Sequence, residues 1–110
     1  MITQKVVING KVYKLQHPGN REWLKLQASL YNPKTDTFNL ETMLDYCFEN
    51  VVFPETGNKL SLDDESLLSD LEVWQTVLPS FLRGKLETGY IWPDNKQAIK
   101  EGRKLLQTEG

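Results

Sequence analysis

The clearest hydrophobic pattern in the chain lies between Ser66 and Leu86, in the segment SLLSDLEVWQTVLPSFLRGKL. Charged residues interrupt every apolar run in it, so the pattern indicates a helix that covers a core rather than one that spans a bilayer. Pro79 lacks the N–H that a helix interior needs, so the segment predicts two helical pieces that meet at an angle, from 63 to about 77 and from 79 to about 86. They are either the two arms of one kinked helix or two separate helices. The stripe consists of Leu67, Leu71, Trp74, Leu78, Phe81 and Leu82.

Two segments upstream also carry helical patterns. Asn39 suits an N-cap, and the residues after it follow the i, i+3, i+4, i+7 spacing. Asn20 suits the N-cap of the other helix, which should end before Asn32-Pro33 because helices rarely continue into the residue before a proline. The apolar residues of the helix that follows Asn39 are Leu40, Met43, Leu44, Cys47, Phe48 and Val51. Those of the helix that begins near Asn20 are Trp23, Leu24, Ala28, Leu30 and Tyr31.

A β-hairpin is predicted near the N-terminus, where KVVINGKVYKLQ occupies residues 5–16. Asn9-Gly10 separates two runs rich in β-branched residues, and this dipeptide fits a type I′ turn, in which both central residues need a positive φ. Because an isolated hairpin is marginally stable, one of its faces should lie on the helices or its strands should join those of another subunit.

The C-terminal part combines a structured linker, ETGYIWPD, with a basic helix over residues 94–108. The linker residues Tyr90, Ile91 and Trp92 either plug the core or belong to a partner-binding surface. Asp94 and Gln97 suit a capping pair, while Gly102 in the middle of the helix costs about 1 kcal/mol relative to alanine. This pattern predicts a marginal helix that can detach from the core. Its thin apolar stripe is formed by Ala98, Ile99, Leu105 and Leu106.

Together these elements predict one mainly α domain over residues 1–110, in which a hairpin at 5–16 packs on a bundle of four to five helices with its core at 20–88. The chain is long enough for a single modest core. The apolar share of 39 % and the charged share of 25 % are ordinary for a globular protein. The single cysteine excludes an intrachain disulfide and a cysteine-based zinc site.

No set of residues has the spacing of a catalytic, cofactor-binding or metal site. His17 is the only histidine, and Cys47 lies on an apolar helix face, where a cysteine usually acts as a small hydrophobe. The run Asp63-Asp64-Glu65 lacks the alternation of a calcium loop and fits the first turn of a helix better. We therefore expect a protein that is not an enzyme and needs no cofactor.

The charges also limit the partners. A net charge of -2 and the absence of a signal-like N-terminus favour a cytoplasmic protein that binds no membrane. The basic residues of the last helix lack interleaved aromatic residues, so a solvated helix face explains them as well as nucleic-acid binding does. These residues are Lys96, Lys100, Arg103 and Lys104.

Three phrases follow one another in a recognisable order: KLQHPGNREWLKLQ after the hairpin, ENVVFPETG, and VLPSFLRGKL. In this architecture and in these sequence segments, residues 5–86 resemble the small tail assembly chaperones encoded by siphophages and prophages of Gram-positive bacteria. The resemblance implies an α-helical protein of the host cytoplasm that is absent from the mature virion.

The resemblance further implies binding to the tape measure protein, help to tail tube subunits that polymerise around it, self-association, and a longer form made by translational frameshifting. The partner could pack as a helix in a groove, and the open hairpin edge could pair with a neighbouring subunit. The residues that we expect to bind the partner are Tyr90, Ile91, Trp92, Leu105 and Leu106. The alternatives are a small phage structural protein such as a head-tail connector, and a small nucleic-acid-binding regulator.

Overall fold

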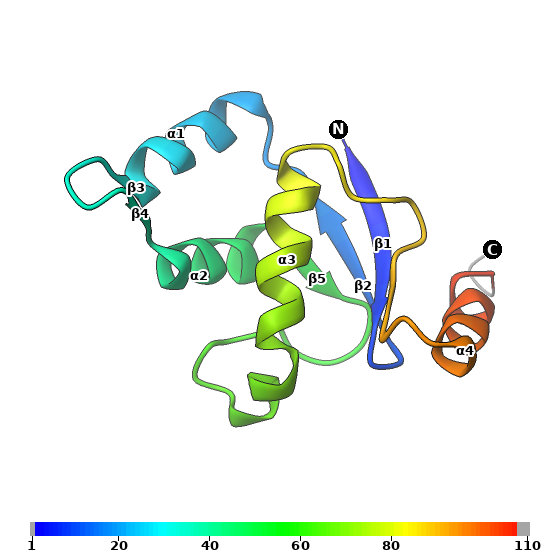
Figure 1. The fold of residues 1–110 in the computed structure, drawn as a ribbon. Coiled ribbons are helices and arrows are strands. Elements are labelled where there is room, and N and C mark those ends of the chain that lie inside the picture. The colour runs from blue at the N-terminus through cyan, green and yellow to red at the C-terminus, as the bar shows by residue number, and fades with distance from the viewer. Residues whose placement is uncertain (1, 108–110) are drawn as a thin grey trace.

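A computed structural model describes residues 2–107 of the chain (Figure 1). Its strands are β1 (Thr3–Ile8), β2 (Lys11–Gln16), β3 (Tyr31–Asn32), β4 (Thr37–Phe38), β5 (Val52–Pro54) and β6 (Ile91–Trp92). Its helices are α1 (Asn20–Leu30), α2 (Leu40–Asn50), the 3₁₀ helix η1 (Glu65–Asp70), α3 (Leu71–Leu82) and α4 (Lys96–Gln107). Position 108, which the sequence places at the end of the last helix, lies outside the described residues.

The fold is mixed α/β, so the prediction of a mainly α protein with a single hairpin was wrong. In the described part of the chain, four strands form a mixed sheet in the order β5-β2-β1-β6, and β3 and β4 form a separate two-stranded ribbon. The strands that the sequence did not reveal are only two or three residues long, which is too short for an alternating pattern. Strands β5 and β6 acquire their structure from the hairpin beside which they lie, and β3 and β4 pair with each other.

The hairpin itself was predicted correctly. Asn9 and Gly10 have φ values of 51° and 76°, as a type I′ turn requires, and they set the register in which Val7 lies opposite Val12. However, β5 pairs antiparallel with β2 and β6 pairs parallel with β1, where Val7 lies opposite Ile91. Each strand of the hairpin therefore has a second partner strand within the chain on its outer edge, whereas the sequence suggested an open edge.

The sheet separates a large core from a small one. Helices α2 and α3 lie on one side of β1 and β2, and α4 lies on the other (Figure 1). Val6 and Ile8 of β1 belong to the large core, whereas Val7 is buried towards α4. This alternation across β1 explains why three consecutive residues of one strand are all buried. Tyr13, Leu15, Phe48, Trp74 and Phe81 are among the other members of the large core.

Helix α3 runs through Pro79 without a break, so the predicted division at this residue was wrong. Pro79 lies in the last turn and removes only the hydrogen bond to the carbonyl of Gln75, a residue exposed to solvent. The change of helix type comes earlier, between η1 and α3. The helix ends at Leu82. Beyond it, Gly84 N–H donates to Phe81 O and Lys85 N–H donates to Ser80 O, a Schellman arrangement that allows no continuation to Leu86.

The N-termini of the two upstream helices differ in how well the sequence predicts them. Asn39 caps α2 as expected, because its Oδ1 accepts a hydrogen bond from Thr42 N–H at 3.0 Å. The cap of α1 is Gly19, one residue before the predicted Asn20, which is the first helical residue.

Helix α4 packs on β6 and β1, whereas the sequence predicted a helix that can detach. Gly102 is buried at this contact, and it brings the helix axis close to the side chain of Ile91. Gly102 has a low helix propensity, but the absence of a side chain at this position allows α4 to approach the sheet closely.

Candidate binding surface

The acidic run at the start of η1 serves as a helix cap. Asp64 Oδ1 accepts hydrogen bonds from the backbone N–H of Ser66 at 3.0 Å and from its hydroxyl at 2.8 Å. These two bonds hold the pKa of the Asp64 carboxyl below its usual value. Within residues 2–107, no three His, Cys, Asp or Glu side chains come together as a metal site would require.

His17 is a structural residue that ties three parts of the chain together. Its ring is buried against Phe81, at 5.9 Å between centroids. Nδ1 accepts a hydrogen bond from Gly19 N–H, so Nε2 carries the proton and donates to Leu82 O, both at 2.9 Å. Since both ring nitrogens have protein partners, the side chain lacks the free nitrogen that a ligand or a catalytic base needs.

Cys47 lies in the core with no exposed surface. Burial raises the pKa of its thiol to about 12. A thiol in this state is neutral at physiological pH and is a poor nucleophile.

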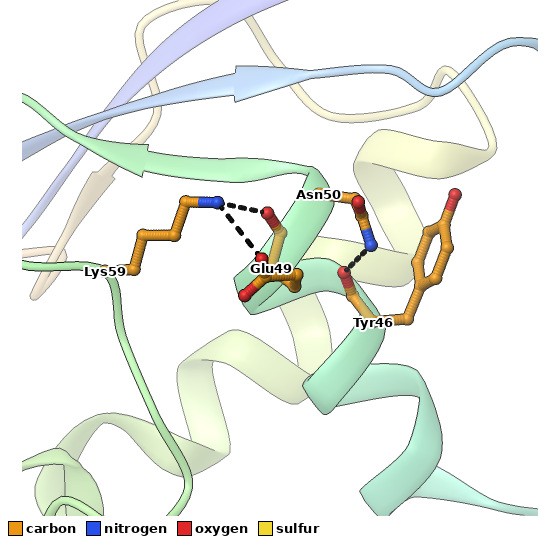
Figure 2. Close-up of polar contacts among 4 residues, drawn as sticks. All are labelled: Tyr46, Glu49, Asn50 and Lys59. Carbon is orange, nitrogen blue, oxygen red and sulfur yellow. Dashed lines mark hydrogen bonds and ion pairs between the residues drawn. The ribbon is translucent and has the colours of Figure 1, made fainter.

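A polar cluster at the end of α2 is also structural (Figure 2). Lys59 Nζ donates to Glu49 O at 2.7 Å, pairs with Glu49 Oε1 at 3.5 Å and lies 5.3 Å from the centroid of the Phe53 ring. Asn50 Nδ2 donates to Tyr46 O at 3.1 Å. These contacts satisfy carbonyl groups in the last turn of α2 and hold the following loop against it.

The residues that the sequence assigned to partner binding lie on β6, on the residue before it and on α4. Tyr90 and Trp92 pack against the large core, whereas Ile91 lies between them in sequence and contacts α4 at Gly102. All three are half-buried, and so are Leu105 and Leu106 on α4. The adjacent positions of β6 therefore point to opposite sides of the sheet, as alternate residues of a strand do.

The structure exposes a different set of apolar side chains, on α1 and the β3–β4 ribbon. We call Leu24, Ala28, Tyr31 and Phe38 the arm surface. Leu24, Tyr31 and Phe38 are 64 %, 44 % and 39 % exposed, although large apolar side chains are usually buried. In Figure 1, α1 and the ribbon lie to one side, away from the four-stranded sheet.

Helical and strand geometry brings these four residues onto one side of the arm. Leu24 and Ala28 share one face of α1 by their i, i+4 spacing, and Tyr31, the extended C-cap of that helix, begins β3 directly after it. Tyr31 and Phe38 are opposite each other in the ribbon, with their ring centroids 6.5 Å apart. The Tyr31 hydroxyl donates to Asp36 Oδ1 at 2.6 Å, which fixes the ring across the ribbon.

Sequence reasoning missed this surface because α1 has two apolar faces. Leu26 and Leu30 are buried and α1 packs against α2 through this side, while Leu24 and Ala28 point away from it. The sequence interpretation named Leu24 and Leu30 together among the apolar residues of this helix and did not divide them between faces. The two faces could have been separated by their angles about the helix axis, since positions 24, 28 and 31 and positions 23, 26 and 30 form two distinct rows.

Basic side chains flank the arm surface on one side. Arg21 and Lys25 are exposed and lie one turn apart beside Leu24 and Ala28. Lys25 Nζ lies 3.6 Å from Glu22 Oε1, an exposed ion pair that screens its charge only in part.

None of the helices within residues 2–107 is both long enough and apolar enough to cross a membrane. Comparison with family models, with curated proteins and with solved structures gave no significant match.

Proposed function

We propose that this protein is a non-enzymatic tail assembly chaperone that binds the tape measure protein during phage tail morphogenesis. The observation that carries the proposal is the arm surface, on which three large apolar side chains of one helix face and its adjoining ribbon are exposed together. Such a surface is typical of a site that binds another protein.

The arm suits a partner that is itself a long amphipathic helix. Before assembly, a tape measure rod exposes apolar stripes that would otherwise aggregate. Covering a stripe with the arm removes apolar area from water on both partners, at about 25 cal/mol per Å². The resulting interface is small, which is appropriate for a chaperone that must leave before the tail is complete.

The phrases that carry the resemblance also support the proposal. KLQHPGNREWLKLQ spans β2, the turn around His17 and α1, which bears half of the arm surface. ENVVFPETG spans the end of α2 and β5, and VLPSFLRGKL spans the end of α3. The mixed α/β fold does not match the helical protein that the resemblance implies, so the proposal rests on these phrases and on the arm surface.

The proposal includes the cellular setting of such a chaperone. The protein acts in the cytoplasm of the bacterial host, assists the tail tube protein, associates with its own copies and is absent from the mature virion.

Co-expression with a tape measure segment tests the proposal. We expect the wild-type chain to keep the segment soluble and to form a complex of defined mass in light scattering after size exclusion. The double variant Leu24→Ser, Phe38→Ser should leave the segment insoluble, because both substitutions replace apolar side chains of the arm.

Leu68→Ser is the matched control, because Leu68 is 75 % exposed but lies on η1. The proposal would be contradicted if the Leu68→Ser control left the segment as insoluble as the arm variant does. It would also be contradicted if the arm variant solubilised the segment as well as wild type does. Detection of the protein in purified virions would instead favour a structural component such as a head-tail connector.

A nucleic-acid-binding regulator is the second candidate, and it is favoured by the charge of α4. Four basic side chains are exposed on this helix, and among the described residues no carboxylate lies within ion-pairing distance of them. Binding to a DNA duplex that weakens steeply with salt, and that is lost on replacement of these four residues by Gln, would support this function. They are Lys96, Lys100, Arg103 and Lys104.

A further inference from the structure

We infer that the arm surface binds an amphipathic α-helix whose acidic residues lie along one side, against Arg21 and Lys25. The inference deepens the proposed function, and rests on it only for the identity of the partner, because it states the shape and charge that the partner segment must have.

The shape of the arm fits a helix. Leu24 and Ala28 of α1 form a row with Tyr31, the first residue of β3, and in this row the small Ala28 separates two larger side chains. Such a row accepts the ridge of a second helix, because the side chains of one helix pack into the gaps of the other. The row from Leu24 to Tyr31 covers about 10 Å at 1.5 Å per residue, so the partner segment needs at least about two turns.

The charges beside the row are asymmetric. Arg21 and Lys25 flank Leu24 and Ala28 on one side, while Asn20 and Gln27 lie on the other side by helical angle. At the tip of the ribbon the exposed Lys34 is offset by the carboxylate of Asp36, which accepts from the Tyr31 hydroxyl, so the asymmetry comes from the two cations on α1. A helix that binds the apolar row with acidic residues on the matching side gains favourable contacts, and the opposite pattern places like charges together.

A second copy of the chain does not offer such a helix in its described part. The exposed acidic residues of α2 recur at i, i+4 and i+8, but the large apolar side chains of that helix are buried, apart from Leu40 at its start. The exposed polar face of α4 is basic and would repel Arg21 and Lys25. The occupant is therefore a different protein segment. The acidic residues of α2 are Glu41, Asp45 and Glu49.

Two synthetic helical peptides of about four turns test the inference, with the full chain as their receptor. Both carry the same leucine row, and either Glu or Lys at every position flanking one side of it. By fluorescence anisotropy, we expect the wild-type chain to bind the Glu peptide at least about 10-fold more tightly than the Lys peptide, with a difference that shrinks as salt is added.

Charge reversal provides the matched controls. Arg21→Glu with Lys25→Glu should reverse the preference between the two peptides. Lys96→Glu with Lys100→Glu makes the same charge change at the same spacing on α4 and should leave the preference as in wild type.

Three results would overturn the inference. Wild type could bind both peptides equally, or the α4 control could change its peptide preference as much as the Arg21→Glu, Lys25→Glu variant does. The third result is a concentration-dependent dimer of wild type that the arm variant Leu24→Ser, Phe38→Ser abolishes. The last would make a second copy the occupant. The co-expression experiment fails independently, because a chain that follows the peptide charge rule can still leave the tape measure segment insoluble. That combination would contradict the proposed partner and retain the inferred chemistry.

Discussion

Gly102 and Ile91 are packed so closely that a Cβ atom on the glycine would lie 2.8 Å from Cγ2 of the isoleucine. The same Cβ would lie 2.9 Å from Cδ1 and 3.0 Å from Cγ1. The branched side chain of Ile91 is stiff at its first torsion, so it cannot move all three atoms away at little cost. This contact fixes how closely α4 approaches the sheet.

Gly102→Ala should therefore lower the free energy of unfolding by about 1 kcal/mol, because overpacking outweighs the gain in helix propensity. In an Ile91→Ala background the same substitution should raise it by up to about 1 kcal/mol, because the clash is gone and only the propensity remains. Urea unfolding of the four chains measures both effects. The same sign in both backgrounds would contradict this account of the contact.

His17→Phe should lower the free energy of unfolding by about 2–4 kcal/mol, because Gly19 N–H and Leu82 O each lose a buried hydrogen-bond partner. The phenyl ring retains the packing against Phe81, so the loss reports the hydrogen bonds. His17→Gln supplies both a donor and an acceptor and should lose less. Denaturant unfolding separates the two variants, and a larger loss in His17→Gln than in His17→Phe would show that ring packing is the main role of His17.

The buried thiol of Cys47 should make stability fall at alkaline pH. Below pH 9.0 the thiol is protonated in both folded and unfolded chains, so it contributes no pH dependence. Between pH 9.0 and about 12 the unfolded chain releases this proton and the folded chain keeps it. The free energy of unfolding then falls with a slope of up to about 1.4 kcal/mol per pH unit.

Urea unfolding at pH 8 and at pH 10.5 should show this fall, and it should be smaller in Cys47→Ala, which retains every other titrating group. At pH 8 the native thiol should also resist alkylation until denaturant is added. Rapid alkylation of the native chain would show that Cys47 is accessible.

Pro79→Ala should raise the free energy of unfolding by about 1 kcal/mol. The substitution restores an N–H that can bond to Gln75 O, and this gain exceeds the entropy that the more flexible unfolded chain recovers. Thermal unfolding monitored by circular dichroism measures the change. A less stable variant would mean that packing of the half-buried proline ring outweighs the missing bond.

The sequence predicted the elements whose signals are local. Asn9-Gly10 determines a turn type from two residues, and Asn39 followed by a regular apolar row determines where α2 begins. Pro79 misled because the loss of one hydrogen bond was taken to end the helix, whereas the buried apolar stripe continues the helix to Leu82, and only the Schellman ending at Gly84 shows where it stops.

The remaining features depend on contacts between distant parts of the chain. Val52 and Ile91 belong to strands only because β2 and β1 lie beside them, and no local pattern contains that information. The arm surface was missed for a related reason, because Leu24 and Leu30 are both apolar and only the position of α2 decides which of them is buried. From its helix propensity, Gly102 was expected to destabilise α4, and only its contact with Ile91 shows that the glycine is needed for packing on the sheet.

The parallel pairing of β1 with β6 has a consequence for the order of folding. Strand β1 receives one neighbour from β6, a segment that the ribosome makes long after β1, so the sheet cannot be completed until β6 has been synthesised. Until then, Val7 and one edge of β1 stay open to other chains, and such contacts between distant segments form slowly. A nascent or truncated chain that lacks β6 and α4 therefore exposes an unpaired edge of β1, which is covered by β6 in the native fold.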